Sequence, residues 1–277
     1  MIEKFKDWLI EDGKSANTVR SYILNVEQYM RWYRETFGSE MTALMHSNIL
    51  DYRSYLQNIK KQQATTINSK LAALVSLNTY LTEAGLQQDH VISKKDFLKI
   101  QRSYASPSEL NERDVDAFRQ TVLLSSGIRD HTIVTIMAYA GLRISETLEL
   151  TITDMDCISS EITVTKGKGN KRRVVFIGDK VIHAVKEYLS HRESSSEWMF
   201  PGRDDGHLHR SVVNKIFNRY SETVTPHKLR HFYCSNALEK GYSIHELANQ
   251  AGHANIHTTL LYTNPARAVM KGKANKL

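Results

Sequence analysis

The feature that most constrains this chain is an interruption of its helical pattern after residue 100 of 277. Residues 1–100 carry apolar side chains at helical spacing and show no alternating strand pattern. A polar stretch, residues 101–109, follows and contains Pro107. Beyond it, helical segments resume around two short β-prone runs. The sequence therefore predicts a mainly α protein with a small β-sheet, in which a helical domain (1–100) and an α+β domain (110–277) are joined by the linker 101–109.

The N-terminal domain is expected to hold four helices, over residues 2–9, 15–37, 48–59 and 66–83. Ser15 or Asn17 can cap the second helix, and glycines follow the second and fourth helices. The apolar spacing predicts that the following side chains face the core: Tyr22, Ile23, Val26, Tyr29, Met30 and Tyr33 in the second helix, Leu50, Tyr55, Leu56 and Ile59 in the third, and Ile67, Leu71, Leu74, Leu77 and Leu81 in the fourth.

The C-terminal domain is expected to combine helices with a β-hairpin. The helices are predicted over residues 112–124, 131–140, 180–190, 211–219, 226–240 and 244–250. Strands over 161–165 and 172–176 flank the letters KGKGNK, whose glycines and asparagine suit a tight turn. Thr225 before Pro226 predicts a helix start, and Ser243 with Glu246 predicts a capping box.

The chain is basic, with 37 Lys and Arg against 30 Asp and Glu and a formal charge of +7. Five of the basic residues lie within 166–173, and four more lie within 267–276. This distribution favours a polyanionic partner, although a basic tail also serves solubility.

Several classes of protein are disfavoured by what the sequence lacks. No uncharged stretch approaches the roughly 20 residues that span a bilayer, and the N-terminus does not resemble a secretory signal. Cys157 and Cys234 form no disulfide or metal pattern. His227 and His231 are four apart, but Lys228 stands where a zinc protease needs Glu. We expect a cytoplasmic protein, associated with the nucleoid, that uses neither a metal nor a cofactor.

Two sites suit an anion. Arg143 follows a very apolar segment, and burying it is costly without a partner, which is either Glu146 or a phosphate. His227 and Arg230 lie three apart near a helix N-terminus, whose backbone N–H groups favour anions. The alternative for this pair is an ordinary surface His and Arg beside a capped helix.

Three further residues have both a functional and an ordinary interpretation. Lys168, at the predicted hairpin tip, is able to approach a nucleic-acid backbone or simply to be solvated. His253 follows the helix that stops at Gly252. Tyr262 ends a short pattern and is either a reactive residue or a buried tyrosine with one hydrogen bond.

Taken together, these residues occur in a distinctive order and in distinctive local sequences: AGLRISE around Arg143, TKGKGNKRRVVFI around Lys168, TPHKLRH around His227 and Arg230, AGH at His253 and TTLLYTN at Tyr262. The pattern resembles the tyrosine recombinase (phage integrase) family, which includes the Xer recombinases. The resemblance covers residues 110–265 densely, and SANTVRSYILNVEQYMRWY resembles the family's SAM-like core-binding module. In two places the chain departs from the family pattern: Gln250-Ala251 replaces a usual pair of aliphatics, and Asn264 stands where histidine is frequent.

The chemistry of these side chains suits phosphodiester cleavage without a metal. Arg143, Arg230 and His253 can stabilise charge on the phosphate. Tyr262 needs help to act as a nucleophile because a free tyrosine has a pKa of about 10, and His227 is the candidate base. Lys168 can protonate the departing 5′ oxygen. The resemblance implies these same roles and a covalent 3′-phosphotyrosyl intermediate at Tyr262.

The resemblance also implies a homotetramer on two double-stranded DNA sites, exchanging strands through a Holliday junction. We expect the following residues to contact DNA: Thr18, Asn68, Lys70, Lys166, Lys171 and Arg172. A further hypothesis is that the tail, residues 266–277, docks on a neighbouring subunit. The sequence leaves open the target site, any second recombinase or accessory protein, and whether the role is integration, excision or resolution. Two alternatives are a type IB-like nicking and resealing activity and a catalytically silent architectural DNA-binding protein.

Overall fold

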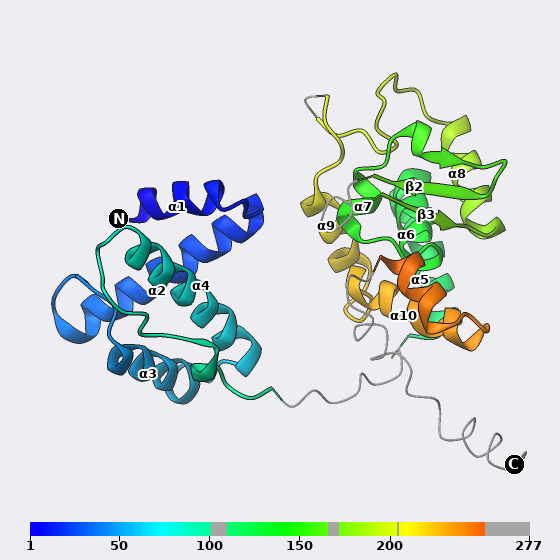
Figure 1. The fold of residues 1–277 in the computed structure, drawn as a ribbon. Helices are drawn as coiled ribbons and strands as arrows, with labels where there is room; N and C mark the ends of the chain where they lie inside the picture. Colours follow the sequence, from blue (N-terminus) through cyan, green and yellow to red (C-terminus); the bar gives the residue numbers. More distant parts are fainter. Residues whose placement is uncertain (101–109, 166–171, 204, 253–277) are drawn as a thin grey trace, which may run out of the picture. The chain divides into compact units, whose positions relative to one another are not determined.

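The computed structural model describes residues 1–100, 110–165, 172–203 and 205–252. The chain divides into two compact units, Met1–Arg102 and Ser103–Leu277 (Figure 1). The predicted linker, the hairpin tip and the C-terminal tail lie outside the described residues.

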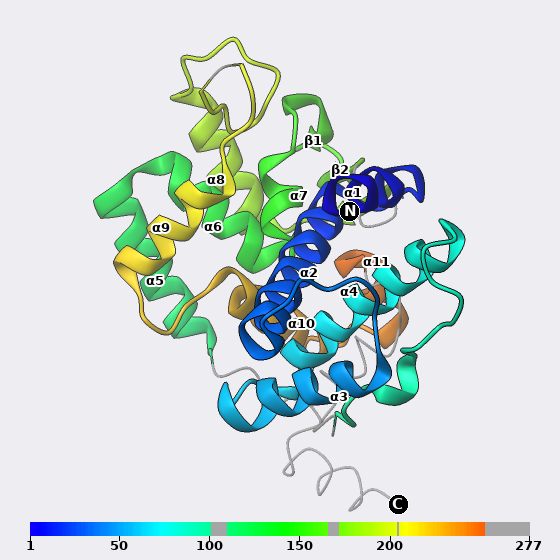
Figure 2. The same ribbon diagram turned by 90° about the vertical axis from the view of Figure 1, so that its left-hand side faces the viewer.

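The N-terminal unit is helical, as predicted. Its elements are α1 (Ile2–Glu11), α2 (Ala16–Phe37), α3 (His46–Ser54) with a π-helical continuation η1 (Tyr55–Ile59), α4 (Ala64–Glu83) and the short 3-10 turn η2 (Lys94–Asp96). Ser15 caps α2 by accepting a hydrogen bond from the N–H of Thr18, and Gly38 ends α2 in the left-handed conformation with φ of 69°. Helix α2 packs along α4, and α1 packs across both (Figure 2).

The core of this unit is rich in aromatic rings. Tyr29, Trp32 and Tyr52 are buried, and their ring centroids lie 4.9–5.7 Å apart. The prediction for the third helix was right for Leu56 and Tyr55, which pack in the core, and wrong for Ile59, which is 70% exposed. Ile49 and Tyr52 are buried in place of the predicted Leu50. The π-helical turn explains part of the error, because its wider turn breaks the 3.6-residue period beyond Ser54.

The C-terminal unit is built around α6. Its helices are α5 (Glu112–Ser126), α6 (Ile128–Tyr139), α7 (Ile144–Leu148), α8 (Asp179–Ser190), α9 (Arg210–Tyr220), α10 (Pro226–Glu239) and α11 (Ile244–Ala251), with a 3-10 turn η3 (Ile152–Asp154). Helices α5, α8 and α10 all pack against α6, which is buried along most of its length. The short helix α7 is not predicted by the sequence, and α6 begins three residues earlier than predicted.

A three-stranded antiparallel sheet of order β1-β2-β3 completes this unit. Its strands are β1 (Met155–Asp156), β2 (Glu161–Val164) and β3 (Arg173–Phe176). The β2–β3 pairing places Val164 opposite Arg173, which confirms the two predicted strands and their antiparallel pairing. Helix α11 packs against β3 at the open edge of the sheet.

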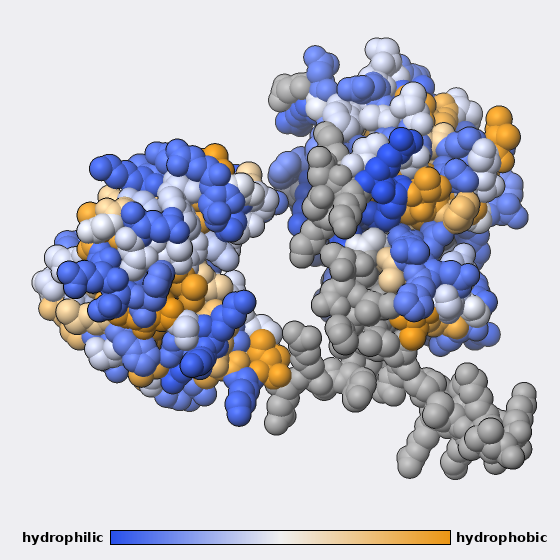
Figure 3. Space-filling view, in the orientation of Figure 1, coloured by the Kyte–Doolittle hydropathy of each residue, from blue (hydrophilic) through white to orange (hydrophobic). Residues whose placement is uncertain are grey.

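Both units expose mainly hydrophilic residues on the face drawn in Figure 3, with smaller hydrophobic patches. Val174 and Phe176 contribute such exposed apolar surface on β3. Among the described residues, none of the helices has the length and apolar character needed to cross a membrane.

Candidate active site

Arg143 stands at the junction between α6 and α7. Helix α6 ends before Gly141, whose φ of 64° turns the chain, and Arg143 then caps the start of α7. Glu146, in the first turn of α7, accepts the Arg143 main-chain N–H at 2.9 Å and its Nη1 at 2.7 Å. The structure therefore gives Arg143 the anionic partner that the sequence offered as one of two alternatives.

A second arginine binds the same carboxylate. Arg173, the first residue of β3, donates from Nη1 to Oε1 of Glu146 at 3.0 Å and from Nη2 to Oε2 at 2.8 Å. The Glu146 side chain is only 2% exposed. Burial by itself raises the pKa of this carboxyl, but the hydrogen bonds and positive charges of Arg173 and Arg143 outweigh burial and hold the pKa below its ordinary value. Glu146 therefore carries a negative charge shared by two arginines.

Arg230 reaches the same region from α10. Thr225 caps this helix by accepting the N–H of Lys228, with Pro226 in the first turn as predicted. Arg230 is buried, and it donates from Nη1 to the carbonyl of Gly141 at 2.6 Å and from Nη2 to the carbonyl of Ala251 at 2.5 Å.

The C-terminal end of α11 is the point where the three arginines meet. Its last carbonyls accept Arg173 Nε at Gln250 (3.2 Å), Arg230 Nη2 at Ala251 (2.5 Å) and Arg143 Nη2 at Gly252 (2.9 Å). The carbonyls at a helix C-terminus lack helical partners and carry partial negative charge, so cations bind there favourably. The predicted capping box at Ser243 and the stop at Gly252 are both confirmed.

His227 lies on the exposed side of the first turn of α10. Its ring contacts that of His231, with centroids 4.7 Å apart in an edge-on arrangement. The pKa of His231 is lowered, first by burial and then by the neighbouring His227 and Arg230. The face shared by His227 and Arg230 thus runs from exposed imidazole to buried guanidinium.

The structure brings together Arg143, Glu146 and Arg230, three of the site residues predicted from sequence. Arg172 is exposed just before β3. Five of the remaining predicted residues lie outside the described residues: Lys166, Lys168, Lys171, His253 and Tyr262.

Arg173 is the site residue that the sequence prediction missed. Strand alternation could have found it, because Arg173 shares the inward face of β3 with the buried Val175. An arginine on the core-facing side of a strand requires a buried partner, and Glu146 is that partner here.

The three predicted DNA-contacting residues of the N-terminal unit also have contacts within the protein. Asn68 donates from Nδ2 to the carbonyl of Leu98 at 2.9 Å and accepts the Leu98 N–H at 2.8 Å. Lys70 is buried, donates to Gln28, and has its pKa lowered by burial. Thr18 shares a hydroxyl hydrogen bond of 2.9 Å with Ser15. Lys70 lines a cleft of about 390 Å³ together with the exposed Arg31.

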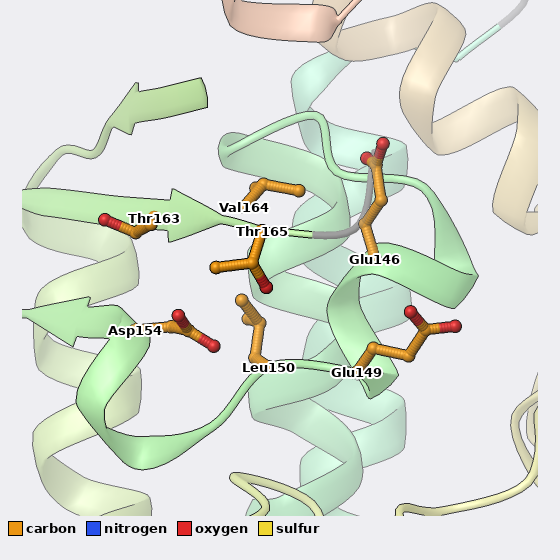
Figure 4. Close-up of a pocket in the computed structure, with 7 residues that line it drawn as sticks. All are labelled: Glu146, Glu149, Leu150, Asp154, Thr163, Val164 and Thr165. Carbon is orange, nitrogen blue, oxygen red and sulfur yellow. The ribbon is translucent and has the colours of Figure 1, made fainter. Parts of the chain in front are cut away.

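Three carboxylates line a narrow hollow between α7 and β2, but they do not form a metal site. Glu146, Glu149 and Asp154 lie around it, and their carboxylates point in different directions (Figure 4). Asp154 accepts the N–H and hydroxyl of Thr151. Within the described ranges, no three His, Cys, Asp or Glu side chains are grouped so as to hold a metal ion.

Comparison with known proteins identifies both units. Residues 108–268 match the model of the phage integrase family, and residues 2–85 match the phage integrase N-terminal SAM-like domain. The chain is 44% identical to the TnP I resolvase of Bacillus thuringiensis over 280 aligned residues, which cover 99% of each chain. It is 31% identical to the tyrosine recombinase XerA of Pyrococcus horikoshii, across 95% of this chain and 88% of that protein.

Solved structures share the fold. The Tn1549 transposon integrase in complex with a circular intermediate DNA has a TM-score of 0.73 at 17% identity, over 100% of this chain and 99% of that chain. XerH recombinase bound to palindromic difH substrate also has a TM-score of 0.73, at 20% identity, over 92% of this chain and 78% of that chain. These likenesses confirm the predicted fold of a SAM-like domain followed by a tyrosine recombinase catalytic domain. The chain belongs to the phage integrase family and is a tyrosine recombinase, an enzyme that carries out site-specific recombination by the tyrosine mechanism.

Proposed function

We propose that this chain binds a specific duplex DNA site and cuts and rejoins its strands through Tyr262, with Arg143 and Arg230 holding the phosphate. The observation that carries the proposal is the fixing of both arginines on the adjacent carbonyls of Ala251 and Gly252. His253 is the next residue in the sequence. The DNA complexes of the Tn1549 integrase and XerH support DNA as the partner.

Arg143 retains the capacity to bind an anion. A guanidinium has five N–H donors, and the described contacts to Glu146 and Gly252 take one donor on each of two nitrogens. Its side chain is 30% exposed, so a phosphate can approach from solvent. Glu146 holds the guanidinium in one orientation by binding both its side chain and its main-chain N–H.

The proposed reaction is a transesterification at phosphorus. Tyr262 Oη attacks the phosphorus while the bond to the 5′ oxygen breaks, and Lys168 supplies the proton to that oxygen. His227 accepts the tyrosine proton, and Arg143, Arg230 and His253 stabilise the charge on the non-bridging oxygens. The 5′-hydroxyl of a partner strand then attacks the phosphotyrosine and releases Tyr262. Each step exchanges one phosphodiester for another, so the reaction needs no metal, nucleotide or other cofactor.

Resolution of replicated mobile DNA is the biological role that we propose. The support is the 44% identity to a resolvase over nearly the whole of both chains. In this role two DNA sites are held by a homotetramer whose exchange passes through a Holliday junction, with the tail 266–277 docking on a neighbouring subunit. Such an enzyme works where the DNA is, in the cytoplasm at the nucleoid.

The N-terminal unit, Met1–Arg102, is proposed to grip the core site, and the C-terminal unit to carry the chemistry. The exposed Arg172 and the Lys residues 166, 168 and 171 next to it in sequence would bring positive charge to the DNA backbone. Thr18, Asn68 and Lys70 remain predicted contacts of the N-terminal unit.

Covalent trapping on a nicked suicide DNA substrate tests this function. The substrate is drawn from DNA flanking the gene, EDTA is present, and the wild type is compared with Tyr262→Phe and with Tyr242→Phe, a control at an exposed tyrosine. We expect a denaturant-resistant adduct with the wild type and Tyr242→Phe and none with Tyr262→Phe. Tight, specific binding without an adduct would favour the architectural alternative, and relaxation of plasmids lacking the site would favour the nicking and resealing alternative.

A further inference from the structure

Two elements that carry site residues are joined by one glutamine. Strand β3 lies at the edge of the sheet and leaves the hairpin whose sequence contains Lys168. Helix α11, orange in Figure 1, packs against β3. In the sequence, α11 leads directly into His253. Gln250, in the last turn of α11, accepts the main-chain N–H of Phe176 on its side-chain Oε1 at 3.1 Å. Its main-chain carbonyl accepts Arg173 Nε at 3.2 Å.

The position of Gln250 is buried, with only 7% of its surface exposed. As noted from the sequence, the family usually has an aliphatic residue at this position. A leucine or methionine there would fill the space but could not accept the Phe176 N–H. The Phe176 N–H, on the edge strand, has Oε1 of Gln250 as its acceptor, and this hydrogen bond holds the strand and the helix together in this chain.

Arg173 extends this connection to the site. While its Nε binds Gln250, its other two nitrogens bind Glu146, which holds Arg143. The guanidinium also passes close over Gly252: a Cβ atom on that residue would lie 2.6 Å from Arg173 Cζ. Arg173 therefore lies close to the end of α11 at two residues, Gln250 and Gly252.

We propose that Gln250 is a positioning residue for strand cleavage, which holds the last turn of α11 on β3 so that the carbonyls of Ala251 and Gly252 keep Arg230 and Arg143 aligned on the scissile phosphate. The proposal rests on the function proposed above. Gln250 itself touches no reacting atom and acts through the two arginines.

The test compares Gln250→Met with a matched control, Asn249→Met, on the exposed side of the same helical turn. Single-turnover cleavage is measured at saturating enzyme on the nicked suicide substrate. We expect Gln250→Met to cleave about tenfold more slowly or worse, because small misplacements of catalytic groups have large effects on rate. The control and the DNA affinity of both variants are expected to stay within about twofold of wild type, as for surface substitutions.

A second substrate separates positioning of the arginines from other defects. A sulfur in place of the 5′-bridging oxygen leaves without needing a proton, so it rescues a defective general acid but not a defective phosphate clamp. We expect the sulfur-containing substrate to restore the cleavage rate of Lys168→Ala and to leave cleavage by Gln250→Met slow. Cleavage by Gln250→Met at the wild-type rate, or its rescue by sulfur, would overturn the proposal.

Hydrogen exchange of the Phe176 amide gives a readout that does not require catalysis. We expect faster exchange in Gln250→Met than in wild type or Asn249→Met, because the acceptor is removed. Unchanged protection would overturn the proposal. Failure of the proposed function has a different signature, since the wild type itself would then form no adduct on DNA that it binds.

Discussion

Glu146 and Arg173 lie 27 positions apart in the chain and form a bidentate ion pair, with N–O distances of 3.0 and 2.8 Å. The pair joins α7 to β3 next to Arg143. Since the same carboxylate also holds Arg143, one buried negative charge is placed between two positive ones. The stability of the C-terminal unit and the geometry of its candidate active site are therefore linked through the side chain of Glu146.

Removing the charge of Glu146 should destabilise the C-terminal unit. In Glu146→Gln the two arginines face each other without a full countercharge, and breaking a buried pair from one side costs about 3 kcal/mol. The measurement is urea-dependent hydrogen exchange of amides in α6, which reports on this unit alone. Glu149→Gln, just beyond α7, is the matched control, and a loss as small as that of the control would contradict the assigned role.

The Glu146 carboxylate also makes the free energy of unfolding depend on pH. The pKa of Glu146 is lowered in the folded protein from its ordinary value of 4.5, because the contacts to Arg173 and Arg143 outweigh burial. The unfolded chain therefore takes up the proton first, so this stabilisation is complete above about pH 4.5 and is lost as the pH falls through the folded pKa. Unfolding free energy measured between about pH 3 and 6 should fall less steeply in Glu146→Gln than in wild type; parallel curves would rule this out.

Gly141→Ala should lower the stability of the folded protein far more than an ordinary glycine substitution does. A Cβ at Gly141 would lie 2.1 Å from Cδ1 of the buried Tyr233, and the backbone there has φ of 64°. Left-handed strain and overpacking together should cost about 3 kcal/mol or more. At Gly38 φ is 69° and no atom lies within 4 Å of the new Cβ, so Gly38→Ala should cost only the backbone strain, about 1 kcal/mol of stability. Calorimetric unfolding of both variants checks the difference, which should vanish if Tyr233 can move aside.

Because the Gly141 carbonyl accepts Arg230, Gly141→Ala should also slow strand cleavage. The rate constant for adduct formation is the measurement. A variant that is unstable yet cleaves at the wild-type rate at low temperature would show that this carbonyl does not position Arg230.

Asn68→Ala should reveal whether this residue reads DNA or holds the protein together. Both ends of its amide bind the backbone of Leu98, so we expect a loss of about 2 kcal/mol in the stability of the N-terminal unit. DNA affinity should then fall equally for all sequences. Ser69→Ala, at the adjacent exposed position, is the control. Relaxed preference at a single base pair would instead support the groove contact predicted from sequence.

Local signals were sufficient for much of the fold. The caps at Ser15, Thr225 and Ser243 mark helix starts because a side-chain oxygen before a helix satisfies a backbone N–H nearby in sequence. Long-range packing decides what these signals leave open. Tyr52 rather than Leu50 faces the core because its ring packs against Tyr29 and Trp32 of α2, a contact that spacing within the third helix does not encode.

The site shows the same division between local and distant information. Glu146 was predictable as a partner of Arg143 because the two are one helical turn apart. Arg230 was predicted from its place near a helix start, but its two carbonyl acceptors, at Gly141 and Ala251, lie 89 and 21 positions away. Arg173 was missed because its partner Glu146 is in another element, even though strand alternation marked it as inward-facing.

The carbonyls at the end of α11 have a consequence for the thermodynamics of DNA binding. A free arginine side chain loses about 2 kcal/mol of rotamer entropy when it is held in one conformation. Arg143 and Arg230 are held by Gly252 and Ala251 when the protein folds, before any phosphate arrives. That entropy is lost once, in folding, and binding of the scissile phosphate then requires little reorganisation of these two side chains.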